Sequence, residues 1–430
     1  MSERILRVGM LGCGNVGAAV IRLLEEHRDD IARRAGCRLR VTKVAVRDPE
    51  RDRGVPLERS AFVTDPMAVI DDPDVDIVCE LIGGVEPAAQ LVLAAFDRDK
   101  PVVTANKELL ATRGRELFDA SDAKGLDLYF EAAVGGGIPL IRPLKESLAG
   151  ERLRRVIGIV NGTTNLILTK MAEEGRAFAD VLAEAQRLGY AEADPTADVE
   201  GHDSAAKCSI LASIAFNARV VADDVFREGI SRVTPEDIEY ARRLGYVVKL
   251  LAIAEMGADE RIAVRVHPAM IPAAHPLASV RDAFNAVFLE GDKVGELMFY
   301  GPGAGGDPTA TAVVGDLVTV ARNLLTGARG VGCTCFHERT IRPMAEMTGQ
   351  YYILLRVEDR PGVLAEIASV LAENEVSIKS VWQEGSGEDA QLVFITHRAM
   401  EGPFQRAVTQ LRGLPAVEEV RSVLRVEGEE

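Results

Sequence analysis

The N-terminal segment combines a strand pattern, a glycine-rich turn and an amphipathic helix pattern. Residues 5–11 are mostly apolar and β-like, and Gly12-Cys13-Gly14-Asn15-Val16-Gly17 follows at once. An amphipathic helix is then expected to about residue 34, and a second strand over residues 39–46 completes a βαβ unit. In such a turn the first glycine allows the tight bend, the second the approach of a pyrophosphate, and the third close packing of helix on strand. The pattern predicts a Rossmann-type, doubly wound parallel sheet. The dinucleotide contacts expected from the turn are Gly12, Gly14, Asn15 and Gly17.

Composition excludes several other classes of protein. Two arginines before the first apolar run imitate a signal peptide, but that run holds four glycines and an asparagine, which fits a nucleotide-binding turn better. No apolar run reaches the ~18 residues of a membrane span. The net charge of −16 disfavours nucleic acid and anionic membranes as partners. The six cysteines show no zinc spacing, so reduced thiols and a cytoplasmic location are expected.

The residues after the second strand bear on the choice of cofactor. A carboxylate there would bind the ribose 2′-hydroxyl of NAD, whereas an arginine would accept the 2′-phosphate of NADP. Arg47 comes first, Asp48 follows it, and Arg51 and Arg53 are close in sequence. Because Arg47 precedes Asp48, the sequence favours NADP as the cofactor, and use of NAD is left open. These arginines are also compatible with a merely solvated loop.

Three further strands are expected to end in residues that suit a ligand site. Residues 76–82 end in Gly83-Gly84, residues 102–103 in Thr104-Ala105-Asn106-Lys107, and residues 126–133 in Val134-Gly135-Gly136-Gly137. Carboxyl ends of parallel strands face the ligand crevice, which gives Lys107 a position that a random surface lysine lacks. The three-glycine turn is either only a tight turn or, with Glu131, a set of oxygen ligands for a hard cation. Further candidate cofactor contacts at such ends and in the glycine-rich loop of residues 301–307 are Gly83, Thr104, Lys107 and Gly306.

The stretch of residues 188–207 places five carboxylates before one lysine. Its first half is expected to be a loop, and a helical apolar period begins at about Asp198. Asp203 and Lys207 are then four residues apart on one helical face. Spacing alone indicates a solvated salt bridge worth about 0.2–0.5 kcal/mol. The carboxylates are Glu192, Asp194, Asp198, Glu200 and Asp203.

The chain is long enough for several domains. We expect a dinucleotide-binding domain over residues 1–135, with residues 307–340 packing back on it, and an α+β substrate and dimerisation domain over residues 136–306. Residues 350–430 show the order strand, helix, strand, strand, helix, strand. This order predicts a ferredoxin-like module.

Several motifs together resemble the homoserine dehydrogenase family with a C-terminal ACT domain. The longest is Ala185-x-x-x-Gly189-Tyr190-Ala191-Glu192-Ala193-Asp194-Pro195-x-x-Asp198-Val199-x-Gly201-x-Asp203-x-x-x-Lys207. Others are Thr104-Ala105-Asn106-Lys107, Glu131-Ala132-Ala133-Val134-Gly135-Gly136-Gly137 and Asn161-Gly162-Thr163-Thr164-Asn165. The tail resembles an ACT domain through Val357-x-Asp359-Arg360-Pro361-Gly362-Val363-Leu364 and Asn374-x-Val376-Ser377-Ile378. The resemblance covers essentially the whole chain.

The resemblance implies reversible NAD(P)H-dependent reduction of L-aspartate 4-semialdehyde to L-homoserine, on the route to threonine, methionine and isoleucine. It implies that Lys207 and Lys107 handle the proton, with Asp203 as partner of Lys207, that Glu192 binds homoserine, and that Val16 and Lys107 contact the cofactor. It also implies a homo-oligomer (dimer or tetramer) and an amino-acid effector, for which threonine is expected. A cation site for a monovalent ion such as Na⁺ is implied at Glu131, Val134, Gly136 and Ile138. The expected effector-binding residues are Asp359, Pro361, Gly362, Val363 and Asn374.

Elementary chemistry agrees with this assignment. Hydride transfer to an aldehyde leaves an alkoxide that needs a proton and positive charge, which lysines supply. The substrate's ammonium group requires carboxylates, and its carboxylate requires amides or a hydroxyl group. The candidate substrate contacts are Glu192, Asp198, Thr163 and Tyr190.

Two alternatives remain to be weighed against this interpretation. An aldehyde dehydrogenase forming an acyl-phosphate would need a nucleophilic cysteine, and Cys208 is expected to be buried. A non-catalytic amino-acid sensor would not need intact Lys107, Lys207 and glycine turn. We therefore expect an enzyme.

Overall fold

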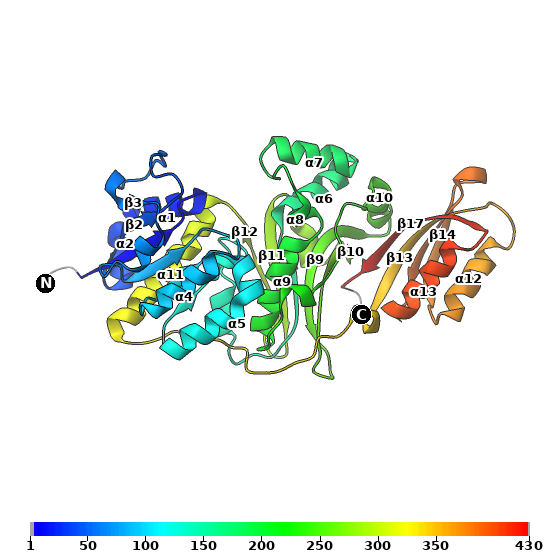
Figure 1. Ribbon diagram of the computed structural model, residues 1–430. Helices are drawn as coiled ribbons and strands as arrows, with labels where there is room; N and C mark the ends of the chain where they lie inside the picture. The colour runs from blue at the N-terminus through cyan, green and yellow to red at the C-terminus, as the bar shows by residue number, and fades with distance from the viewer. Residues whose placement is uncertain (1–3, 429–430) are drawn as a thin grey trace. The chain divides into compact units, whose positions relative to one another are not determined.

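The computed structural model describes residues 4–428, and tertiary contacts divide it into two compact units (Figure 1). The first unit comprises Met1–Val156, Ala206–Asp224 and Asn285–Arg339. The second comprises Ile157–Ala205, Val225–Phe284 and Thr340–Glu430, so that the tail groups with the middle of the chain. No helix within residues 4–428 is long and apolar enough to cross a membrane.

The first unit contains a six-stranded sheet in the order β3-β2-β1-β4-β5-β6. Its ladders are parallel, and the strand order reverses between β1 and β4. Such a reversal creates the crevice in which doubly wound sheets bind ligands. The predicted Rossmann-type sheet is thus confirmed. The strands are β1 (Ile5–Leu11), β2 (Arg38–Ala45), β3 (Phe62–Val63), β4 (Ile77–Glu80), β5 (Val102–Thr104) and β6 (Leu128–Tyr129).

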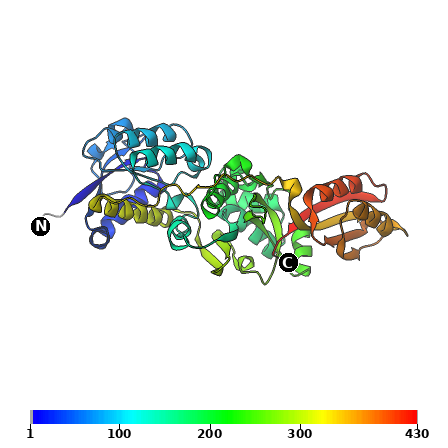
Figure 2. The same ribbon diagram turned by 90° about the horizontal axis from the view of Figure 1, so that it is seen from below.

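Helices cover this sheet and enclose its core (Figure 2). The buried side chains of β1, including Val8 and Met10, pack in one cluster with those of α1 and α11. Residues 307–326, although remote in sequence, therefore belong to the nucleotide-binding core through α11. The helices are α1 (Asn15–Glu26), α2 (Arg28–Ala35), α3 (Met67–Ile70), α4 (Ala88–Asp97), α5 (Lys107–Lys124) and α11 (Gly306–Thr326).

Three expected elements differ from the structure. The helix expected to residue 34 is two helices, because His27 leaves helical geometry between α1 and α2. The strand expected over residues 126–133 is only β6, because Glu131 starts a 3₁₀ turn. The helix expected from Asp198 is interrupted at Gly201, whose φ of 80° is left-handed.

The second unit joins helices to a mixed sheet. Within it, β9, β10, β17, β13, β15 and β14 are neighbours in that order. The antiparallel pair β9–β10 is almost entirely buried along its length. Elements before the tail are α6 (Gly162–Glu174), α7 (Phe178–Arg187), α8 (Thr196–Val199), α10 (Pro235–Arg243), β8 (Phe226–Arg227), β9 (Tyr246–Met256) and β10 (Ile262–Pro272). Elements that cross the boundaries of the units are β7 (Leu153–Ile159), α9 (His202–Ala215) and β11 (Phe284–Gly291), and β12 (Gly295–Pro302) belongs to the first unit.

The tail has the expected βαββαβ order, with one short extra strand, β16 (Ala399–Met400). Helices α12 and α13 bury Ile367 and Phe404 in a separate apolar cluster with the sheet. The first helix begins at Val363 rather than at Pro361, because Gly362 caps it with a left-handed φ of 95°. The principal tail elements are β13 (Thr348–Val357), α12 (Val363–Glu373), β14 (Ile378–Glu384), β15 (Gln391–Thr396), α13 (Glu401–Arg412) and β17 (Val417–Val426).

The last strand of the tail pairs directly with β10 of the same unit. Ala269 and Met270 lie opposite Arg425 and Val426 in a parallel ladder. Two buried arginines accompany this pairing. Arg265 donates to Glu255 (2.9 Å) and Glu427 (2.8 Å). Arg425 donates to Glu401 (2.6 Å) and Glu228 (2.8 Å), so charge pairs reinforce the short ladder.

His267 lies beside this junction and predicts an acid-sensitive fold. Its side chain is fully buried, and burial, then the charge of Arg425, lowers its pKa to about 3. The unfolded chain, with an ordinary histidine pKa near 6.5, binds the proton more readily, so stability falls as pH drops from about 6.5 towards 3. The loss from this group is on the order of 5 kcal/mol at the acid limit.

Thermal unfolding measured between pH 7 and pH 4.5 checks this expectation. His267→Gln should flatten the dependence of Tm on pH, whereas His337→Gln, at an exposed histidine, should keep the wild-type slope. Equal slopes in all three proteins would contradict the assignment to His267.

Candidate active site

The glycine turn has the geometry that dinucleotide binding requires. A Cβ on Gly12, whose φ is 97°, would lie 2.7 Å from the carbonyl oxygen of Leu81. A Cβ on Gly17 would lie 2.9 Å from the carbonyl oxygen of Gly12, so this position holds α1 against the end of β1. At Gly14 nothing lies within 4 Å, which leaves the exposed side open. The first-turn amides of α1 receive no side-chain cap from Gly14 and can face an anion.

A groove of about 1110 Å³, including open space at its mouth, runs from this turn to the end of β2. Arg47, Arg51 and Arg53 line it. Arg53 donates to the carbonyl oxygens of Cys13, Arg51 and Asp48 at 3.2, 2.7 and 2.7 Å, which fastens the loop to the glycine turn. The carboxylate of Asp48 accepts the amide of Glu50. Arg53 therefore organises the groove, while Arg47 is exposed within it.

A buried hydrogen-bond network connects the ends of β4 and β5. The Thr104 hydroxyl donates to Glu80 (2.6 Å), whose other oxygen accepts the amides of Ile82 and Gly83. Asn106 donates to the carbonyl of Gly84 (2.7 Å) and caps α5 by accepting the amide of Leu109. Thr104 is thus fully buried, whereas Gly83 is exposed at the turn that the network holds. Lys107 follows the cap as the first residue of α5.

Glu80 is a residue that the sequence interpretation missed. It ends an apolar strand, is completely buried, and organises both the Gly83-Gly84 turn and Thr104. The available signal was a single carboxylate at the carboxyl end of a buried parallel strand.

Gly306 lies at the N-terminus of α11, against the start of α1. A Cβ at this position would lie 3.2 Å from the carbonyl oxygen of Asn15. The two helices therefore begin side by side, and their positive ends reinforce each other at the glycine turn. The structure thus brings Gly306 together with Asn15, which is remote from it in sequence.

In the three-glycine turn, the backbone carbonyls differ in whether they accept a hydrogen bond. The carbonyl of Gly135 accepts the amide of Ile138 at 2.9 Å. Among residues 4–428, no N–H donates to the carbonyls of Val134, Gly136 or Ile138, all of which belong to buried residues. Backbone oxygens of this kind are hard ligands, so the turn fits a cation of the sodium type.

The Glu131 carboxylate is occupied by backbone and side-chain donors. One oxygen accepts the amides of Leu140 and Ile141 at 2.5 and 2.8 Å, and the other accepts the amide of Arg142 at 2.9 Å. Its side chain therefore fixes the segment that follows the turn. The buried Asp316 of α11 accepts the amide of Glu131, and burial raises the pKa of Asp316 to about 8.

Helix α9 does not display Asp203 and Lys207 as a solvated pair. Both are 9% exposed, which excludes the surface salt bridge that spacing alone suggested. The side-chain amide of Asn161 donates to Asp203 (2.9 Å) and to Asp198 (2.7 Å), and its oxygen caps α6 at Thr164. Asn161, missed as a site residue from sequence, thus brings two predicted carboxylates together at the start of α6.

Of the other predicted substrate contacts, Tyr190 and Glu192 lie on the loop after α7 and Thr163 lies in the first turn of α6. The Thr163 hydroxyl donates to the carbonyl of Tyr190 (2.9 Å), which joins the start of α6 to that loop. Gln186 donates to the carbonyl of Glu192 (3.0 Å), and the side chains of Glu192 and Tyr190 are exposed. The loop is therefore tethered through its backbone while both side chains stay accessible.

The predicted effector residues fall into two places. Asp359, Pro361, Gly362 and Val363 surround the N-terminus of α12, where the Asp359 carboxylate accepts the amide of Gly387. Asn374 caps the other end and donates to Gln410 of α13. Eleven residues of helix separate the ends by about 15 Å, so Asn374 does not share a single-chain site with the other four.

The glycine turn at the end of β1 and the parallel sheet define a dinucleotide-binding protein, and its tail is a ferredoxin-like βαββαβ module. Family models agree over most of the chain: "Homoserine dehydrogenase, NAD binding domain" matches residues 12–131, "Homoserine dehydrogenase" residues 139–318 and "ACT domain" residues 351–416. The chain belongs to the homoserine dehydrogenase family.

Individual relatives support this membership along the full length. The chain is 50% identical over 425 residues to a homoserine dehydrogenase of Corynebacterium glutamicum, covering 98% of this chain and 95% of the relative. A crystal structure of a homoserine dehydrogenase from Thiobacillus denitrificans matches with a TM-score of 0.94 and 43% identity, covering 99% of each chain. A hyperthermophilic archaeal homoserine dehydrogenase in complex with NADPH matches with a TM-score of 0.64 and 26% identity, covering 76% of this chain and 99% of that chain.

Proposed function

We propose that this enzyme catalyses the reversible NADPH-dependent reduction of L-aspartate 4-semialdehyde to L-homoserine, a step towards threonine, methionine and isoleucine. The observation that carries the proposal is the burial of Asp203 on α9, where the side-chain amide of Asn161 holds it, together with the burial of Lys207 one helical turn later. Loss of NADPH absorbance on addition of L-aspartate 4-semialdehyde tests it directly. A folded protein without turnover would favour a non-catalytic sensor instead. The acyl-phosphate alternative has no support, because Cys208 is 2% exposed.

Lys207 and Lys107 are proposed as the groups that move the proton. A bound reduced nicotinamide would supply hydride for the aldehyde carbon, and the aldehyde oxygen requires a proton as it becomes the alcohol; in the reverse direction the alcohol oxygen gives that proton up. An ammonium group both donates that proton and stabilises the developing negative charge. Asp203, on the same helical face as Lys207, would orient the lysine.

We place substrate recognition at the carboxylates of Glu192 and Asp198 and at the loop after α7. Glu192 and Asp198 would bind the α-ammonium group, because paired charges compensate the loss of hydration. Thr163 and Tyr190 would contact the α-carboxylate region. Asn161 is added as a positioning residue, because it already holds Asp198 and Asp203 in one arrangement.

NADP is the proposed cofactor, bound at Gly12, Gly14, Asn15, Val16, Gly17 and Gly306 and at the exposed turn of Gly83. Thr104 is proposed to act indirectly, through the network that holds this turn. The one carboxylate at the end of β2, Asp48, accepts a loop amide, whereas Arg47 is exposed in the groove. Arginine binds phosphate groups with paired charge-assisted hydrogen bonds.

Arg47→Ala should raise KM for NADPH about tenfold, on the scale of one lost charge-assisted contact, and leave KM for NADH nearly unchanged. Arg59→Ala is the matched control, because Arg59 pairs with Glu50 on the same loop and does not line the groove. Steady-state kinetics with both cofactors measure the effect. Equal increases for both cofactors would show that Arg47 does not read the 2′-phosphate.

A sodium-type cation is proposed at the turn of residues 134–138, held by the carbonyls of Val134, Gly136 and Ile138. The Glu131 carboxylate fixes the next segment and supplies negative charge. Such an ion would stiffen the turn on which β6 ends.

Threonine is proposed as the effector of the ACT domain, bound at the N-terminus of α12. The uncapped first-turn amides of α12 suit its carboxylate. Asp359→Ala should raise the threonine concentration for half-inhibition tenfold or more, while Asn374→Ala, at the far end, should leave it within about twofold. If wild-type activity is indifferent to threonine, the tail senses another ligand.

Self-association and a cytoplasmic location complete the proposal. The edge strand β14 exposes Val381 (38%) and Trp382 (40%), which is typical of a surface that pairs with another copy in a dimer or tetramer. All six cysteines are free, which suits a reducing compartment.

A further inference from the structure

A segment without helix or strand crosses the first unit after α11. Residues 328–336 are tied down along their length. The amide of Gly330 donates to Asp127 (2.9 Å), Lys145 donates to the carbonyl of Val331 (2.8 Å), and the amide of His337 donates to the carbonyl of Asn217 (2.9 Å). This strap carries the sequence Cys333-Thr334-Cys335.

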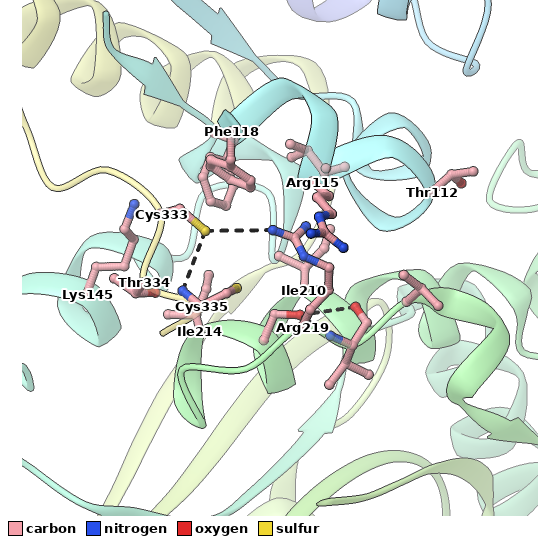
Figure 3. Close-up of a pocket in the computed structure, with 16 residues that line it drawn as sticks. Thr112, Arg115, Phe118, Lys145, Ile210, Ile214, Arg219, Cys333, Thr334 and Cys335 are labelled. Carbon is pink, nitrogen blue, oxygen red and sulfur yellow. Dashed lines mark hydrogen bonds between the residues drawn. The ribbon is translucent and has the colours of Figure 1, made fainter. Parts of the chain in front are cut away.

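The strap forms one wall of a cavity of about 590 Å³, including open space at its mouth (Figure 3). Aromatic and aliphatic side chains, including Phe118 and Ile214, make the apolar walls. Three cations, Arg115, Lys145 and Arg219, line the same cavity. Their positive charge favours an anion within it and disfavours a metal cation.

The sulfur of Cys333 is surrounded by donors. Arg219 lies 3.8 Å from it and the amide of Cys335 lies 3.5 Å from it, as the dashed lines of Figure 3 show. A hydrogen bond from the Cys335 thiol, and then that amide and the Arg219 charge, lower the pKa of Cys333 to about 6 despite its partial burial. The pKa of the Cys335 thiol is raised, since it acts as the donor.

The other four cysteines lack this environment. Cys13, Cys37, Cys79 and Cys208 are buried, and burial raises the pKa values of the first three. Cys333 and Cys335 are partly exposed. A reactive thiolate with a second thiol next to it therefore occurs at one place among the described cysteines.

We propose that Cys333 is a peroxide-reactive thiol and that Cys335 resolves its oxidised form into an intrachain disulfide. The Cys333 thiolate attacks one oxygen of a hydroperoxide, so that an S–O bond forms, the O–O bond breaks and the leaving oxygen takes a proton as water or alcohol. The Cys335 thiolate then attacks the sulfenic sulfur, forming the S–S bond, and the oxygen leaves as water. The two thiols lose two electrons in total, which the peroxide gains.

This modification site does not depend on the proposed dehydrogenase reaction. It uses none of the residues assigned to cofactor or substrate, and its readout is the mass of the protein. Failure of either proposal leaves the other open to its own test.

Mass spectrometry of the full chain after treatment with hydrogen peroxide tests the proposal. The tryptic peptide between Arg329 and Arg339 should lose two hydrogen atoms, and dithiothreitol should restore them. In Cys335→Ser the sulfenic acid should persist and label with dimedone at Cys333, whereas Cys333→Ser should show neither labelling nor disulfide. An unlabelled Cys333 in Cys335→Ser, or a disulfide between two chains on a non-reducing gel, would overturn it.

The variant Arg219→Met tests whether Cys333 is activated by the nearby positive charge or reacts only because it is exposed. The Arg219 charge is one of the interactions that lower the pKa of Cys333 to about 6, so its removal should slow the labelling of Cys333 by iodoacetamide at pH 7 and move the pH profile of labelling upward. Arg115→Met is the matched control, because Arg115 lines the same cavity but pairs with Asp119. An unchanged pH profile in Arg219→Met would remove Arg219 from the mechanism.

Discussion

Lys207→Met is expected to lower kcat for aspartate semialdehyde reduction by at least ~10²-fold while NADPH binding is retained. The reason is that Lys207 is 9% exposed on α9 beside Asp203, in a setting where an ammonium group can deliver a proton to a bound substrate. Cofactor binding should survive because the glycine turn, the arginine groove and Gly306 belong to other elements. Stopped-flow or steady-state assays, with NADPH binding followed by fluorescence, provide the measurement.

Two variants distinguish proton transfer from packing. Lys207→Arg keeps the positive charge but holds its proton too tightly to exchange it, so kcat should stay low. Lys170→Met removes a lysine that pairs with Glu184 on the neighbouring helices α6 and α7, and kcat should remain near that of the wild type. Full activity in both Lys207 variants would mean that Lys207 has only a structural role in α9.

Arg425→Met is expected to destabilise the second unit by about 3–5 kcal/mol, the cost of leaving a buried carboxylate without its partner. Arg425 is 8% exposed and makes two hydrogen bonds to Glu401, which is itself 4% exposed. Thermal unfolding and hydrogen exchange of the amides in β17 measure the effect.

Arg421→Met is the matched control on the same strand. Its guanidinium pairs with Glu236 with about a third of each side chain exposed, and such pairs contribute 1 kcal/mol or less. Similar losses in the two variants would mean that burial of Arg425 is not what makes its pair important. A double variant with Glu401→Gln should recover part of the loss, because no unpaired charge then remains.

The sequence predicted the nucleotide-binding part of the molecule well because its constraints are local. Gly12, Gly14 and Gly17 each meet a specific steric demand within one strand–turn–helix unit, and the structure shows three different surroundings for them. The tail was also predictable, since its six main elements follow one another in the order strand, helix, strand, strand, helix, strand, which is typical of one known module. The predicted ends of elements were wrong where the backbone changes conformation at one residue, as at Glu131, where a 3₁₀ turn starts inside the expected strand.

The substrate side required information that a linear pattern does not carry. Asp203 and Lys207 had the spacing of a surface pair, and only tertiary packing shows that both are buried. Asn161 and Glu80 were missed because the distant partners that show their roles, Asp198 and Thr104, lie 37 and 24 positions away, so neither spacing nor periodicity relates them. Asn374 was grouped with the α12 N-terminal residues by motif, although the helix itself keeps it at the opposite end.

The ladder between β10 and β17 also bears on what removal of the tail would do to the rest of the fold. One side of β10 is covered by β9, and the other by β8 and by two residues of β17. Cutting the chain before β13 would expose unpaired amides and carbonyls along this edge of β10, and it would remove Glu427, the partner of Arg265. An exposed strand edge of this kind promotes pairing with a second chain. Under the proposed control by threonine, variants that escape inhibition should therefore arise by substitutions around Asp359 rather than by premature stop codons.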